Sequence, residues 1–181
     1  MNSSDNIEAP RPNNILDRSI AKVSELLSLL FAFTVLISFY EVLSRYVFNS
    51  PTIWVHETAS FLGGSLFVIG GAYALATDKH VRVVLIYDSV SARTKRYLNI
   101  FHHLAGLLFS GLLVFAAWQM VSNSWFTPWG EMRLETSGTA WDPPFPALLK
   151  GLILVTVSLM FIQFTLHLIS EIQGLQEEDD V

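Results

Sequence analysis

The sequence predicts an all-α integral membrane protein with four transmembrane helices. Hydrophobic residues make up 51% of the 181 residues and charged residues only 15%, whereas a soluble domain has roughly 25% charged residues. Four stretches lack Asp, Glu, Lys and Arg: residues 26–40, 58–77, 97–130 and 151–170. Because a helix needs about 20 apolar residues to cross a bilayer, these stretches predict four spans in one compact unit.

The first charge-free stretch is too short to cross the bilayer alone. Its 15 residues would extend only about 22 Å as an α-helix, so we expect the first span to continue through Glu41 and Arg45 and to cover residues 26–48. Apolar residues recur at helical spacing from Leu16 to Leu27, which favours an N-terminal amphipathic helix over a solvated lead-in. No basic signal-peptide start or small-residue cleavage site is evident, so we expect this span to be retained.

Turn signals bound the second span. The sequence Asn49-Ser50-Pro51 predicts a tight turn, with Ser50 as the cap of the next helix and Pro51 at its first position. The second span is therefore predicted over residues 53–77.

The third and fourth spans are predicted over residues 97–121 and 150–171. The long connection between them contains four prolines that prevent regular helix in its later part: Pro128, Pro143, Pro144 and Pro146. Residues 176–181 are acidic and are expected to form a disordered tail. Residues 1–175 then form a single membrane domain.

The basic residues predict that both termini lie in the cytoplasm. Three precede the first span and five lie between residues 78 and 96, whereas the two connections on the other side hold only three. Lys and Arg concentrate in cytoplasmic loops. Four of the five tryptophans fall in the external connections, at the headgroup level that indole rings prefer. They are Trp54, Trp125, Trp129 and Trp141.

Composition excludes several kinds of chemistry. The chain has no cysteine, which excludes disulfides, thiolate zinc sites and iron–sulfur clusters. The net charge of −5 removes the electrostatic basis for nucleic-acid binding. No phosphate-binding loop, nucleophile elbow, HExxH motif or catalytic carboxylate pair occurs. We therefore expect neither an enzyme nor a metal or cofactor site.

The charges around the first turn are the most informative ones. Glu41 and Arg45 are spaced i and i+4, and Glu57 enters the second span just across the turn. A charge near hydrocarbon must be paired or face protein or water. One interpretation is a proton or ion site at Glu41, and the other is an ion pair centred on Arg45 that locks the hairpin or meets a partner. The sequence favours the ion pair, because an adjacent arginine keeps a carboxylate ionised.

Small residues mark the second span. Gly63 and Gly64 recur seven residues later as Gly70 and Gly71, which predicts a small-residue face over two turns. Such faces allow close helix packing in lipid. Packing within the chain is the favoured interpretation, and docking to another membrane protein is the alternative.

Three histidines sit near the inner ends of the last two spans. His102 or His103 is predicted to approach His167, which is the arrangement that bis-histidine haem ligation would need. The sequence favours interfacial or hydrogen-bonded histidines.

Several motifs resemble the small, DctQ-like permease subunit of TRAP (tripartite ATP-independent periplasmic) transporters. Residues 45–51 (RYVFNSP), followed by Trp54 and Glu57, resemble the family's first hairpin. Residues 80–83 (HVRV) resemble its central loop, although Val84 stands where many relatives have an acid. Residues 135–139 (ETSGT) resemble the external loop of one branch of the family.

The resemblance implies a non-catalytic small subunit that scaffolds the large permease subunit of a sodium-coupled, binding-protein-dependent importer of organic acids. Its expected location is the bacterial inner membrane, and its expected partners are the large permease, a periplasmic solute-binding protein and lipids. The resemblance assigns structural or interface roles to Arg45, Trp54, Glu57 and His80. Two alternatives remain: a self-sufficient multidrug-type carrier, and a haem-binding membrane anchor.

Overall fold

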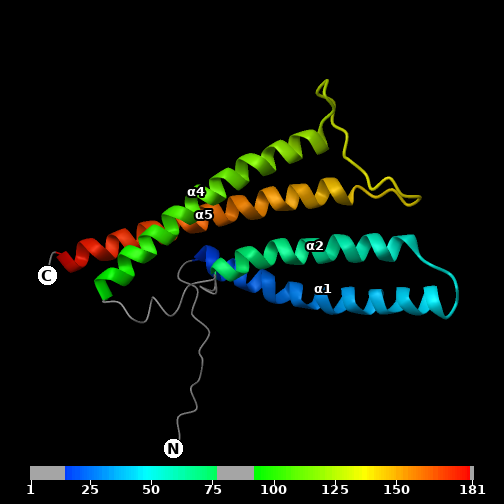
Figure 1. The fold of residues 1–181 in the computed structure, drawn as a ribbon, viewed down its shortest axis with the longest axis horizontal. Helices are drawn as coiled ribbons and strands as arrows, with labels where there is room; N and C mark the ends of the chain where they lie inside the picture. The colour runs from blue at the N-terminus through cyan, green and yellow to red at the C-terminus, as the bar shows by residue number, and fades with distance from the viewer. Residues whose placement is uncertain (1–14, 77–91, 180–181) are drawn as a thin grey trace, which may run out of the picture.

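The computed structural model describes residues 15–76 and 92–179 (Figure 1). Within these residues the chain forms four α-helices, and the only pairing of extended chain is an isolated bridge between Phe126 and Met132. All four helices are long and apolar enough to cross a membrane. The prediction of an all-α protein with four candidate spans is therefore confirmed.

The helices form two antiparallel hairpins (Figure 1). The first consists of α1 (Ile15–Tyr46) and α2 (Ile53–Ala76), and the second of α4 (Ala92–Trp125) and α5 (Phe145–Asp179). The hairpins meet where α2 packs against α5, so the helices follow one another in space as α1, α2, α5 and α4. The connections 47–52 and 126–144 lie at the same end, which we call the hairpin end (Figure 1).

Helices α1, α4 and α5 extend beyond the predicted spans, whereas α2 does not. Helix α1 begins at Ile15, so the predicted amphipathic lead-in is helical and continuous with the first span. In this lead-in Ile20 is buried and Arg18 and Lys22 are exposed, as expected for an amphipathic helix. A charge-free stretch marks only the part of a helix that suits hydrocarbon, so the helix continues into polar sequence at either end.

Helix α5 extends into the segment predicted as the acidic tail. Residues 176–179 were expected to be disordered, yet they form the end of α5. Glutamine and glutamate are good helix formers, so the helix continues through them beyond the candidate span, which ends at residue 173.

The turn between α1 and α2 also differs from the prediction. Ser50 does not cap α2: its backbone N–H donates to the carbonyl of Ser44 at 2.9 Å and thereby closes the end of α1. Helix α2 begins two residues after Pro51, at Ile53. Asn49 adopts a positive φ of 49°, a conformation that asparagine tolerates better than most residues.

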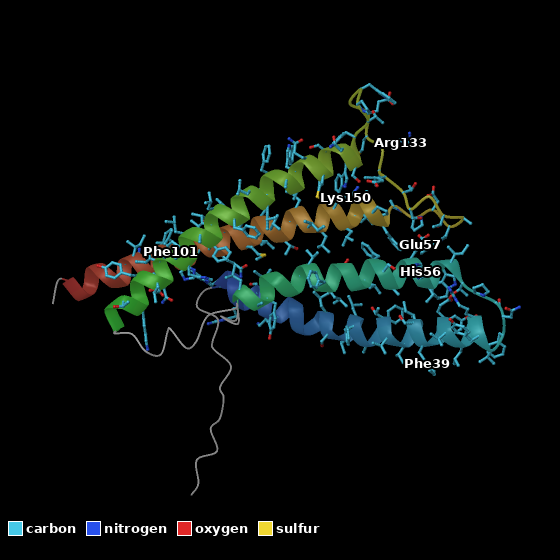
Figure 2. All side chains as sticks on the ribbon, viewed as in Figure 1. Phe39, His56, Glu57, Phe101, Arg133 and Lys150 are labelled. Atoms are coloured by element: carbon cyan, nitrogen blue, oxygen red, sulfur yellow. The ribbon has the colours of Figure 1, made fainter. Side chains whose placement is uncertain are left out.

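The buried core is small because most apolar side chains face outward. Ile20 packs with Ala72 and Ala76 near the ends of α1 and α2 that lie away from the hairpin end. Figure 2 shows Phe39 and Phe101 on the outside of the helices, where both are exposed. In a bilayer such side chains lie among lipid tails or against another membrane protein.

Candidate functional site

One carboxylate closes the first hairpin. Glu41 is buried near the end of α1, and its Oε1 accepts hydrogen bonds from Arg45 Nη2 at 2.7 Å and from Arg45 Nε at 3.2 Å. Its Oε2 accepts a bond from the backbone N–H of Thr52 at 3.0 Å and one from the Thr52 hydroxyl. Glu41 therefore joins the end of α1 to the start of α2, and we call Glu41, Arg45 and Thr52 the hairpin clasp.

The ion pair predicted between Glu41 and Arg45 is present. The side chain of Arg45 is 49% exposed, whereas that of Glu41 is 11% exposed. Both oxygens of Glu41 accept hydrogen bonds from other residues of the hairpin. The exposed part of Arg45 leaves a positive charge at the hairpin end of the molecule.

A second carboxylate ties α2 to the long connection. Glu57 Oε1 accepts hydrogen bonds from the Ser137 hydroxyl at 3.1 Å and from the Thr139 hydroxyl. The turn that carries these hydroxyls is stabilised by Asp142, whose Oδ1 accepts a 2.9 Å bond from the backbone N–H of Gly138. Gly138 has a φ of 72°, a conformation that glycine adopts without strain. Glu57 thus holds residues 137–139 against the start of α2.

Glu57 also lines a cavity. Glu57 Oε2 is buried and accepts no hydrogen bond from the part of the chain that the structure describes. The cavity has a volume of about 400 Å³ and lies between the first turns of α2 and α5 and the long connection. Figure 2 shows His56 and Glu57 on the same end of α2. The lining residues are His56, Glu57, Ser60, Phe61, Ser137, Thr139, Phe145, Pro146 and Leu149.

A third carboxylate holds the other end of the long connection. Glu135 Oε2 accepts a 2.6 Å hydrogen bond from the Ser124 hydroxyl and pairs with Lys150 Nζ. The bond from Lys150, followed by the one from Ser124, lowers the pKa of the Glu135 carboxyl below its ordinary value. Nearby, Trp125 Nε1 donates to the carbonyl of Ala147 at 2.8 Å. These contacts join α4, α5 and the connection between them.

The four glycines of α2 divide into two pairs. A Cβ on Gly64 would meet Leu149 at 3.1 Å, and a Cβ on Gly71 would meet Met160 at 3.9 Å, so this pair faces α5. A Cβ on Gly63 or on Gly70 would meet no described atom within 4 Å. Phe67 lies between them at one helical turn from each and is 85% exposed. We call Gly63, Phe67 and Gly70 the open face of α2.

The predicted approach of the histidines is also present. The rings of His103 and His167 lie 5.5 Å apart, and Phe164 lies 6.2 Å from His103. Further along the same helices, Asn99 Nδ2 donates to Glu171 Oε1 at 2.9 Å. These residues join α4 to α5 at the end opposite the hairpin end.

Of two further predicted site residues, Trp54 lies among the described residues and His80 does not. Trp54 is half exposed on α2, and its ring lies 6.3 Å from that of Tyr40 on α1. His80 lies outside the described residues, as do Val84 and the rest of the central loop.

Sequence reasoning missed the partners of the three carboxylates. Thr52, Ser124, Ser137 and Thr139 all donate hydroxyl hydrogen bonds to a carboxylate. Thr52 follows Pro51 directly, and a hydroxyl next to a predicted helix start was a detectable signal. The other hydroxyls are 11 or more residues from their acceptors, so only the folded arrangement identifies them.

The fold and the site define a multi-pass integral membrane protein whose buried and half-buried carboxylates secure helices and loops. The chain matches the model of the family described as tripartite ATP-independent periplasmic transporters, DctQ component, over residues 34–174. This match covers most of the chain, and the chain therefore belongs to the DctQ component family of TRAP transporters. The resemblance seen in the sequence motifs is thereby confirmed, and the protein is a member of a family of transporter components.

A curated relative agrees with this family. The C4-dicarboxylate TRAP transporter small permease protein DctQ of Vibrio cholerae serotype O1 is 24% identical over 122 residues. The similar region covers 65% of this chain and 47% of the Vibrio protein. The chain thus spans about half the length of this relative.

Proposed function

We propose that the chain is the small, non-catalytic membrane subunit of a sodium-coupled, binding-protein-dependent importer of organic acids. In this proposal it scaffolds the large permease subunit in the bacterial inner membrane and works with a periplasmic solute-binding protein. Membership of the DctQ family supports the tripartite assembly. The name of the Vibrio relative specifies C4-dicarboxylates, which supports organic acids as the substrate class.

The state of Glu41 and Glu135 favours a scaffold over a self-sufficient carrier. A carrier needs a carboxylate that exchanges protons or substrate. Both oxygens of Glu41 are engaged by Arg45 and Thr52, and Glu135 is engaged by Lys150 and Ser124. In a scaffold, by contrast, such internal contacts keep the surfaces that receive a partner in a fixed geometry.

The open face of α2 is the observation that carries the scaffold proposal. Gly63 and Gly70 present bare backbone on either side of the exposed Phe67 ring. In lipid, small residues at helix interfaces let backbones approach closely, and a projecting ring between two gaps gives the contact a defined register. We propose that a helix of the large permease subunit packs on this face. Arg45, at the same end of the molecule as the start of α2, is proposed to contribute a charged contact.

A comparison of the two glycine pairs tests this proposal. The double variant G63L/G70L is expected to keep the fold of the chain, because no described atom lies within 4 Å of either Cβ. It should lose most of the large permease in co-purification from mild detergent. The matched variant G64L is expected to destabilise the chain itself by about 1–3 kcal/mol, because its side chain must displace Leu149.

The readouts are the thermal unfolding of the purified chain and the ratio of large to small subunit after co-purification. Normal unfolding with lost assembly in G63L/G70L is the expected result. Replacement of Arg45 by alanine should also weaken assembly. Full assembly in both G63L/G70L and R45A would contradict the proposed interface.

A further inference from the structure

The cavity beside Glu57 has the chemical character of a binding site. Its volume of about 400 Å³ lies within the range of small-molecule pockets, which are mostly apolar and carry a few placed polar groups. Here the polar groups are a carboxylate, three hydroxyls and the His56 ring. The apolar lining includes Phe61 and Phe145, whose rings stack at 4.5 Å; Trp141, outside the lining, lies edge-on to Phe145 at 5.4 Å.

The charge of the cavity favours a cation. No lysine or arginine is among the described residues that line it, and Glu57 supplies a negative charge. Among the described residues, no group of three or more His, Cys, Asp and Glu side chains is arranged to hold a metal ion. One carboxylate beside aromatic rings suits an organic cation, because the carboxylate and the aromatic rings both attract a positive charge.

The hydrogen bonding of Glu57 specifies the kind of organic cation. Oε1 is occupied by Ser137 and Thr139, whereas the buried Oε2 has no donor in the described chain. A buried acceptor without a donor is costly, and such atoms in a folded protein usually mark a missing partner. The last torsion of a glutamate side chain is soft, so a small rotation turns Oε2 toward the cavity. A primary ammonium group can donate to it, and a quaternary ammonium group cannot.

The position of the cavity favours a lipid as the source of this group. Its lining residues come from the starts of two candidate spans and from the connection 126–144, at the end where Trp54 and Trp141 lie. Tryptophan rings prefer the headgroup level of a membrane. The apolar part of the wall includes Phe61 and Leu149, which lie further along their spans than Glu57 and Phe145 do.

We propose that this cavity binds a primary ammonium group, presented by an aminoethyl lipid headgroup or by a soluble amine. The ammonium group donates a hydrogen bond to Glu57 and lies against the Phe61–Phe145 wall. This site is separate from the open face of α2. Ammonium binding can therefore be tested independently of the proposed scaffold role.

Binding of matched lipids to the full chain tests the site. The probes are phosphatidylethanolamine and phosphatidylcholine with identical short acyl chains, titrated onto the purified chain and measured by native mass spectrometry. We expect phosphatidylethanolamine to bind roughly tenfold more tightly, as for one charge-assisted hydrogen bond. The variant E57Q keeps an acceptor for Ser137 and Thr139 and should abolish this preference. The variant E131Q removes an exposed acid of the same connection, outside the cavity, and should retain it.

Two further measurements sharpen the result. The variant S60F narrows the cavity without touching the bonds of Glu57 and should also weaken phosphatidylethanolamine binding. Free ethanolamine that competes at equal concentration would support the ammonium site and assign it to soluble amines. Equal binding of both lipids by the wild-type chain, or an unchanged preference in a folded E57Q variant, would overturn the proposal. Carbodiimide can couple Glu57 to an amine that lies beside it. Coupling to a lysine of a partner protein, and not to a lipid amine, would also overturn the proposal.

Discussion

The two hairpins of this protein are closed by different means. Helices α1 and α2 are joined by the short connection 47–52 and by one buried carboxylate, Glu41. Helices α4 and α5 are joined by the long connection 126–144, whose carboxylate Glu135 is 46% exposed. The second hairpin compensates through close helix contact, because a Cβ on Gly106 would overlap the Phe164 ring. A short connection therefore depends on one polar residue, and a long one depends on packing between its helices.

The largest effect is expected at the close contact of the second hairpin. The variant G106L must displace the Phe164 ring, which also packs against His103. Overpacking of this kind costs about 1–3 kcal/mol and occasionally more. Unfolding of the purified chain in detergent should show this loss. The matched variant G63L should unfold like the wild type, and a comparable loss there would remove the contrast between packed and open glycines.

A smaller effect is expected at the hairpin clasp. The variant E41A removes the acceptor of Thr52 and Arg45, and should lower stability less than G106L does, because the half-exposed Arg45 can turn to water. Limited proteolysis should detect faster cleavage within residues 47–52. The variant T52V tests the same clasp from the other side and should have a weaker effect. If E41A is cleaved at the same rate as the wild type, the turn stays closed without the Glu41 contacts.

A still smaller effect is expected at Trp125, which anchors the long connection. Replacing Trp125 by phenylalanine removes the 2.8 Å bond from Nε1 to the Ala147 carbonyl, together with the part of the indole ring that lies against Gly151. Loss of one such hydrogen bond costs about 1 kcal/mol. Chemical unfolding measures this difference. An equal loss in the exposed control W129F would argue against a specific role of Trp125.

The smallest effect is the pH dependence of Glu135. Its pKa is lowered in the folded protein, chiefly by the bond from Lys150. The stabilisation is therefore present above the ordinary pKa of a glutamate and is lost as the pH falls through the folded-state pKa. Because the pair is partly exposed, it should contribute at most about 1 kcal/mol and should weaken with salt. The E135Q variant should not show this loss of stability at acid pH. If the stability of E135Q depends on pH as that of the wild type does, the pH dependence comes from another group.

The sequence predicted the local features of this fold well. Charge-free length located four helices, and the i, i+4 spacing predicted the pair of Glu41 and Arg45, because both signals lie within a single helix. The glycine pattern predicted a small-residue face. Successive residues in a helix differ by about 100° in direction, so Gly63 and Gly64 point to different neighbours. Only the position of α5 reveals that Gly64 is packed and Gly63 is open.

The long-range contacts could not be predicted from the sequence. Ser137 meets Glu57 from 80 residues away, through a turn that depends on the positive φ of Gly138. The cavity beside Glu57 exists only because this turn, α2 and α5 converge. Hydroxyl residues are common in external loops, so no local pattern distinguishes those that bind a carboxylate from those that face water.

Affinity purification of the tagged chain from its native host in mild detergent tests whether the chain assembles with a large permease subunit. If the chain is the scaffolding small subunit of a TRAP transporter, one large multi-span permease should be recovered with it in a fixed ratio. The ratio should fall in G63L/G70L and persist in E131Q. Recovery of the wild-type chain alone, as a stable dimer without a permease, would contradict the account and favour a self-sufficient carrier.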